Sequence, residues 1–388
     1  MPAENVPAVD FGLTPEQETH RKAVIAFATS LNEGLEGRDR DGRFSRETWQ
    51  RCADFGILGL PLPARYGGTQ ADPVTIALTM EALGVGCRDA GLLFSCHAQL
   101  WAVELPILLF GTEEQKARYL PGLASGALIG AHAMTEPGSG SDAFSLTTRA
   151  RRRAEGYVLD GRKSFCTNAP VADVVLVFAT LDPTRGRQGV TAFLVERGTP
   201  GLDFGNPTEK MGLRTSPLGE VYLDECVVPA AQRLGAEGGG ALIFERAMEW
   251  ERIFILSSQV GMMERQLDAC VRHVRERRQF GQPIGKFQLV AEKVARMKVR
   301  LDTARLLLYR AAWMKAQGRS PAIEASVAKL FISEAAVESS LDAMQSHGGY
   351  GYTVEFGVER ELRDALAGRL YSGTSEIQTI LIAGLLGL

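Results

Sequence analysis

Residues 275–288 read RERRQFGQPIGKFQ, and this stretch decides how the C-terminal third of the chain is built. Its centre, GQPIG, combines glycine with proline, which interrupt helices, and long segments with helical apolar spacing lie on both sides. Arg277 and Phe280 are three residues apart, so we expect them to share a helical face. By itself the stretch is a loop that joins two helices.

The segments that flank this loop predict a helical bundle. Residues 241–278 contain no proline and no glycine except Gly261, which predicts one helix roughly 55 Å long at about 1.5 Å per residue. Residues 287–318 and 321–345 predict two more long helices. With a fourth helix near the C-terminus, they form a C-terminal four-helix bundle.

The preceding residues predict two other regions. TPEQETHRKAVIAFATSL, from Thr14, opens with a Thr cap and a proline and continues with helical spacing, which later N-terminal segments repeat. Four segments then alternate like strands, GYVLDGRKSF, ADVVLVFATL, QGVTAFLVER and GEVYLDECVVP, with Asp160-Gly161 as a hairpin turn. The fold class is therefore α+β, and we expect an N-terminal helical domain at 1–128, a middle β domain at 129–236 and the helical bundle at 237–388.

The composition excludes several functional classes. The 388 residues are 45% hydrophobic and 23% charged with a formal net charge of -3, as in ordinary soluble proteins, so nucleic acid is not expected as a partner. The six cysteines are scattered, which fits a reducing cytoplasm, and the five histidines show no metal-ligand spacing. The acidic N-terminus, MPAENVPAVDFGLTPEQ, does not read as a signal peptide, and no segment reaches the length of a membrane span.

Three short stretches have the residue types of a cofactor site. AMTEPGSGSD (133–142) resembles a dinucleotide fingerprint, but strands follow it, so we reject a Rossmann fold and expect at most an anion-holding loop. KSFCTN (163–168) predicts a strand that places Phe165 and Thr167 on one face. QSHGGYGY (345–352) has paired glycines that allow close backbone approach.

Together with KMGLRTS, RRQFGQPIGKFQ and YSGTSEIQ, these stretches resemble the acyl-CoA dehydrogenases over essentially the whole chain. The resemblance implies an N-terminal helical domain, a middle β-barrel or sandwich domain and a four-helix domain. It also implies FAD as cofactor and a homotetramer, or at least a dimer. The FAD contacts that it implies within one subunit are Met134, Thr135, Ser141, Phe165, Thr167, Thr374 and Glu376. Those implied across the subunit interface are Arg277, Phe280, Gln288, Gln345, Gly348 and Gly349.

The family reaction needs a base, and Ser372 stands where many members carry the catalytic carboxylate. Serine without an activating partner has far too high a pKa to act as that base. A minority of the family, like isovaleryl-CoA and long-chain dehydrogenases, has its base on the long helix before an arginine, and Glu251-Arg252 matches that position. We therefore expect Glu251 to be the base, with Glu249 and Glu245 as fallbacks. The backbone N–H of Ser372 is expected to bind the thioester carbonyl.

The substrate is less closely defined. We expect a short, branched or cyclic acyl thioester on CoA or a carrier protein, and the stretches CRDAGLLFSCHAQLW and MEWER look most like the branch that acts on carrier-bound prolyl or aminoacyl groups. Electron-transfer flavoprotein or oxygen is the expected electron acceptor. An oxidase or monooxygenase on the same fold, or a flavin-binding protein without catalysis, is an alternative. Expected substrate contacts are Ser141, Glu249, Trp250, Arg252, Tyr371 and Gly373, and further pocket candidates are Phe94, Leu100 and Trp101.

Overall fold

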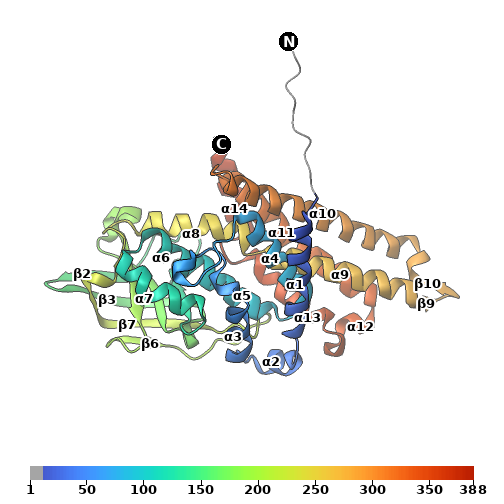
Figure 1. The fold of residues 1–388 in the computed structure, drawn as a ribbon, viewed down its shortest axis with the longest axis horizontal. Helices are drawn as coiled ribbons and strands as arrows, with labels where there is room; N and C mark the ends of the chain where they lie inside the picture. The colour runs from blue at the N-terminus through green and yellow to red at the C-terminus, as the bar shows by residue number, and fades with distance from the viewer. Residues whose placement is uncertain (1–11) are drawn as a thin grey trace, which may run out of the picture.

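The computed structural model of the chain describes residues 12–388, and its elements follow the predicted order of helices, strands and helices (Figure 1). Most of the N-terminus that argues against a signal peptide lies outside these residues. The first helix, α1, begins with the predicted cap: Thr14 Oγ1 accepts the Gln17 N–H at 3.2 Å, and Gln17 Oε1 accepts the Thr14 N–H at 3.0 Å. The N-terminal helices are α1 (Pro15–Ser30), α2 (Leu35–Asp41), α3 (Arg46–Asp54), α4 (Pro73–Gly86), α5 (Ala90–Gln99), α6 (Leu105–Phe110) and α7 (Glu113–Ala124).

The middle region is one eight-stranded sheet in the order β6-β7-β3-β2-β4-β5-β8, with β1 parallel to β4. Alternate side chains of β4 (Val174–Thr180) enter two cores: Val175 and Val177 pack inside the curved sheet, while Leu176 and Phe178 pack against α7 and α8. The sheet is therefore fixed to the helices on one face. The other strands are β1 (Gly130–Ala133), β2 (Arg149–Arg153), β3 (Gly156–Thr167), β5 (Val190–Glu196), β6 (Leu202–Phe204), β7 (Leu218–Pro229) and β8 (Arg233–Leu234).

The hairpin predicted at Asp160-Gly161 is wrong. Gly156–Thr167 is one strand, β3, and the turn between β2 and β3 lies at residues 154–155. Asp160 and Gly161 form an irregularity in the pairing of β3 with β7, where a Cβ on Gly161 would overlap Thr148. The glycine is needed there for close approach rather than for a turn.

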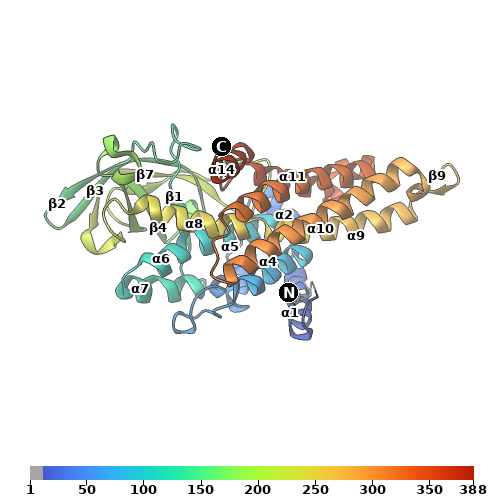
Figure 2. The same ribbon diagram turned by 90° about the horizontal axis from the view of Figure 1, so that it is seen from above.

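The C-terminal region contains long antiparallel helices that extend away from the sheet (Figure 2). The single helix predicted for residues 241–278 is broken, because α8 ends at Phe254 and α9 begins at Ser257. At the break the Ser257 hydroxyl donates to the Phe254 carbonyl at 2.6 Å. The elements are α8 (Gly240–Phe254), α9 (Ser257–Glu276), β9 (Arg278–Gln279), β10 (Gln282–Pro283), α10 (Gln288–Ala316), α11 (Ala322–His347), α12 (Gly349–Tyr352), α13 (Val358–Leu366) and α14 (Ser375–Leu385).

The expectation that Arg277 and Phe280 share a helical face is also wrong. Both belong to the β9–β10 hairpin, with Phe280 and Gly281 at positive φ in its two-residue turn. The domain limits that we infer, at 128/129 and 236/237, fall in the connections between α7 and β1 and between β8 and α8.

One segment reaches the length of a membrane span, contrary to the expectation. Residues Ala90–Phe110 are long and apolar enough to cross a membrane, but 78% of the relevant window is buried inside the molecule. It is placed as a core helix of the N-terminal region.

Candidate active site

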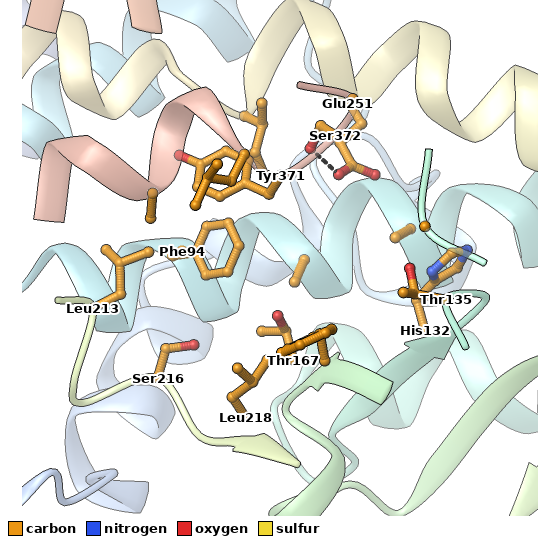
Figure 3. Close-up of a pocket in the computed structure, with 18 of the residues that line it drawn as sticks. Phe94, His132, Thr135, Thr167, Leu213, Ser216, Leu218, Glu251, Tyr371 and Ser372 are labelled. Atoms are coloured by element: carbon orange, nitrogen blue, oxygen red, sulfur yellow. Dashed lines mark hydrogen bonds between the residues drawn. The ribbon is translucent and has the colours of Figure 1, made fainter. Parts of the chain in front are cut away.

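A cavity of about 650 Å³ lies where the sheet, the N-terminal helices and the C-terminal helices meet (Figure 3). One face of α8 forms part of its wall, because Phe244, Met248, Glu251 and Ile255 follow each other at helical spacing and all line the cavity. Other walls come from α5, β1, β3, the segment before β7, α13 and the loop before α14. Residues far apart in the sequence therefore surround one space.

Glu251 points into this cavity and is only 9% exposed. Burial raises the pKa of its carboxyl group, while the Ser372 hydroxyl and the charges of Arg252 and Lys329 oppose that rise. A carboxylate whose pKa is raised is a stronger base and is better suited to accept a proton from carbon.

Ser372 meets Glu251 from the loop before α14, as the dashed line in Figure 3 shows. The Ser372 Oγ donates a hydrogen bond to Glu251 Oε1. Glu251 Oε2 is buried and has no hydrogen-bond partner among the described residues. One carboxylate oxygen is therefore held, and the other is left for a ligand.

The cavity beside Glu251 has an aromatic side and a side of small residues. Phe94 and Tyr371 pack with their ring centroids 4.6 Å apart, and the Tyr371 hydroxyl accepts a hydrogen bond from Gln259 Nε2 at 3.2 Å. Ala98 and Ala102 line the cavity from the N-terminal helices. Leu100 and Trp101, the other expected pocket residues there, are fully buried in the core and do not line it.

The wall opposite Glu251 fits the ring system of the expected flavin. Phe165 is 68% exposed at a bulge of β3, where its φ is 55°, so its ring faces the cavity rather than a core. Thr135, Ser141 and Thr167, which carry hydroxyl groups, line the same cavity. An exposed aromatic ring beside several hydroxyl groups matches a flat ligand with several hydrogen-bond acceptors. Met134 completes this wall.

The residues expected to reach FAD across a subunit interface do not line the cavity. Arg277 and Phe280 lie in the β9–β10 hairpin, at the far end of the long helices (Figure 2). The Arg277 guanidinium lies 5.7 Å from the Tyr350 ring centroid, and Phe280 is 92% exposed. Also absent from the lining of this cavity are Gln288, Gln345, Gly348 and Gly349.

Four further predicted residues also lie outside the cavity lining. The Glu249 carboxylate accepts a hydrogen bond from Lys315, Trp250 stacks against Trp101 at 6.4 Å, and Arg252 is half-buried beside them. Glu376 is exposed on α14. Thr374 lines the cavity, but its hydroxyl caps α14 by accepting the Ile377 N–H at 3.3 Å.

Some lining residues were not predicted. Met248 and Ile255 lie three residues before and four after Glu251, so helical spacing around the predicted base would have found them. His132 shares a strand face with Met134, two residues on, and burial lowers its pKa to about 4. None of the three belongs to a motif that distinguishes it from a core residue.

Comparisons with known proteins agree with this arrangement along the whole chain. Family models described as the N-terminal, middle and C-terminal domains of acyl-CoA dehydrogenase match residues 14–127, 131–226 and 238–386. An L-prolyl-[peptidyl-carrier protein] dehydrogenase of Pseudomonas fluorescens is 43% identical over 97% of this chain and 99% of its own. The solved structure of the prolyl acyl carrier protein oxidase AnaB is 50% identical with a TM-score of 0.96, covering 97% of this chain and 100% of its own. PigA, solved with FAD and proline, is 39% identical with a TM-score of 0.96 over 98% of this chain and 100% of its own.

Proposed function

The chain belongs to the acyl-CoA dehydrogenase family, and from this premise we propose that it oxidises an L-prolyl group held as a thioester on a peptidyl carrier protein. Its activity is the FAD-dependent introduction of a double bond α,β to the carbonyl of an acyl thioester. Similarity over the full length to a prolyl-carrier dehydrogenase and a prolyl-carrier oxidase supports the finer assignment. Electron-transfer flavoprotein or oxygen takes the electrons from the reduced enzyme.

Different residues of the chain carry out different parts of the reaction. Glu251 removes the α-proton through Oε2, the oxygen that Ser372 leaves free. The Ser372 N–H donates to the thioester carbonyl oxygen, where negative charge develops as the proton leaves. When bound, FAD supplies the acceptor for the β-hydride beside Thr167. The Phe94–Tyr371 pair closes the space next to the α-carbon, which suits a small ring.

The test is an anaerobic titration of the FAD-loaded protein with L-prolyl peptidyl carrier protein, followed by the flavin absorbance. L-prolyl-CoA and isovaleryl-CoA serve as comparison substrates. Prolyl carrier protein should bleach the flavin at the lowest concentration, and Glu251→Gln should abolish bleaching while FAD remains bound. Efficient bleaching only by CoA thioesters would contradict the carrier-protein assignment, and bleaching of Glu251→Gln would contradict the base.

Similarity to AnaB, an oxidase that is 50% identical to this chain, favours oxygen as the electron acceptor over a protein acceptor. The prereduced enzyme should then form hydrogen peroxide within the turnover time when it is mixed with aerated buffer. Slow reoxidation in air, with fast reoxidation by electron-transfer flavoprotein, would assign the protein acceptor instead.

We also place the active enzyme in the cytoplasm as a homotetramer. The expected FAD contacts in the β9–β10 hairpin do not line the cavity, so a second subunit is needed to complete the cofactor site. All six cysteines are buried and free, which fits a reducing compartment. Light scattering of the FAD-loaded protein tests the homotetramer. Fractionation of source cells tests the cytoplasmic location.

A further inference from the structure

The turn that carries Ser372 has an unusual backbone conformation. Ser372 and Gly373 are consecutive residues at φ 57° and 88°. The left-handed region is unfavourable for serine, so the surrounding structure must hold this turn in place. How it is held bears directly on catalysis, because the same residue carries both the hydroxyl on Glu251 and the expected carbonyl-binding N–H.

Two fully buried side chains hold the carbonyl groups of this turn. Lys329 Nζ, from α11, donates to the Gly373 carbonyl at 2.6 Å. Gln378 Nε2, from α14, donates to the Ser372 and Gly373 carbonyls at 3.0 and 3.1 Å. Both side chains are 0% exposed. The turn is therefore anchored once by a cation and once by a neutral amide.

The burial of the charged Lys329 side chain lowers the stability of the folded protein. An ammonium group has three donors, and among the described residues only the Gly373 carbonyl accepts from it. A second neutral donor such as Gln378 would hold the same carbonyl without the cost of desolvating a charge. Lys329 does not line the cavity, so it does not touch the substrate.

The charges around Lys329 come from two other elements, α8 and α14. Arg252 on α8 is a second cation, and Glu251 on α8 and Glu376 on α14 are the opposing carboxylates. Burial and then Arg252 lower the pKa of Lys329 to about 8, so the ammonium form predominates at neutral pH. Burial raises the pKa of the Glu251 carboxyl, and the Ser372 hydroxyl, Arg252 and Lys329 lower it.

We propose that Lys329 is a positioning residue for the reaction: it anchors the Ser372–Gly373 turn, whose serine hydroxyl binds Glu251, and it places a buried positive charge behind that turn. The inference rests on the proposed role of Glu251 as the base. The charge favours the form of Glu251 that accepts a proton, and the anchor fixes both functions of Ser372.

The chain offers a matched control, because Gln378 anchors the same turn without charge. Lys329→Met and Gln378→Met are compared as FAD-loaded proteins, together with Glu251→Gln. The first measurement is the pH profile of flavin reduction by L-prolyl peptidyl carrier protein. The second needs no substrate: it is an infrared titration of the carboxyl band that disappears in Glu251→Gln.

Lys329→Met should move the acid limb of the profile, and the midpoint of the infrared band, upward by about one pH unit. It should also lower kcat at neutral pH at least about tenfold and leave KM nearly unchanged. Gln378→Met should lower kcat and move both midpoints less than Lys329→Met does. Lys329→Arg, which retains the charge, should restore the wild-type midpoint.

If Lys329→Met and Gln378→Met lower kcat equally and neither shifts the infrared midpoint, the proposal is wrong and Lys329 has only a structural role. If Lys329→Met does not fold, Lys329→Gln removes the charge while keeping a donor, and the same shift is expected. If Glu251→Gln still reduces flavin, the assignment of Glu251 as the base is wrong, whatever the Lys329 variants show. Failure of the proposed base can therefore be distinguished from failure of the Lys329 proposal.

Discussion

At the scale of residues, the Glu251–Ser372 pair joins the proposed base to the serine at the usual carboxylate position of the family. Glu251 reaches the cavity from α8, and Ser372 occupies one of its two oxygens. The serine is therefore part of the surroundings of the proposed base. Its backbone has a positive φ of 57°.

Ser372→Ala removes the hydrogen bond that stabilises the charged form of Glu251. The pKa of Glu251 should rise, because burial then acts with less opposition. The acid limb of kcat against pH should move upward, and kcat at neutral pH should fall about three- to tenfold.

Ser375→Ala is the matched control for this change. Ser375 is the first residue of α14, and its hydroxyl donates to Glu334 on α11 at 2.6 Å rather than to Glu251. The two variants should differ in their pH profiles. Identical profiles would remove Ser372 from the surroundings of the base.

At the scale of elements, the crossing of α4 and α9 explains the one glycine in the long C-terminal segment. A Cβ on Gly261 would overlap the Glu81 carbonyl, and a Cβ on Gly84 would overlap the Ser258 carbonyl. The two backbones touch at this crossing, directly after the break between α8 and α9. The break lets α8 line the cavity while α9 packs against the N-terminal helices.

Gly261→Ala should therefore destabilise the protein by about 2–4 kcal/mol, since both backbones must separate. Urea denaturation followed by circular dichroism measures the loss. Gly384→Ala on α14, where a Cβ meets nothing within 4 Å, is the control and should leave stability within about 0.5 kcal/mol. A loss in the control equal to that in Gly261→Ala would contradict the close crossing.

The β9–β10 hairpin is the second element with a testable consequence. Its tip exposes the Phe280 ring almost completely, which suggests a partner surface. Phe280→Ala should weaken both subunit assembly and FAD retention, measured by light scattering and by flavin released on gel filtration. Val227→Ala, at an exposed apolar residue on β7, is the control, and FAD retention unchanged in Phe280→Ala would contradict the shared cofactor site.

At the scale of the whole molecule, a buried histidine connects the N-terminal helices to α9. Trp101 Nε1 can only donate, so His97 Nδ1 accepts its hydrogen bond at 2.9 Å, and His97 Nε2 donates to Ser258 Oγ at 3.2 Å. The imidazole is therefore neutral. Burial lowers the pKa of His97 to about 3.

Because His97 is buried in its neutral form, we expect the stability of the fold to decrease in acid. In the unfolded chain His97 binds a proton below a pKa of about 6.5, whereas in the folded protein it binds one only near pH 3. The contribution of neutral His97 to the free energy of unfolding is therefore complete above pH 6.5 and is lost as the pH falls. The free energy of unfolding should fall by up to about 1.4 kcal/mol per pH unit in that window.

His97→Gln keeps an acceptor and a donor but cannot take up a proton. Its free energy of unfolding, measured in urea from pH 7 to pH 5, should depend less on pH than that of the wild type. His20→Gln, at a partly exposed histidine, should keep the wild-type slope. Equal slopes in His97→Gln and the wild type would rule out His97 as a source of the acid sensitivity.

The sequence by itself determined the order of helices, strands and helices, the family, the cofactor and the candidate base, because these depend on local periodicity and on motifs of fixed spacing. Thr14 as a cap and Glu251 before Arg252 are features of this kind. Only the tertiary structure decided the break between α8 and α9, the bulge at Asp160-Gly161 and the β9–β10 hairpin, because neighbouring backbones set these features. The hydrogen bond from Ser372 to Glu251 and the anchor from Lys329 join residues more than 40 positions apart, and no local pattern records them.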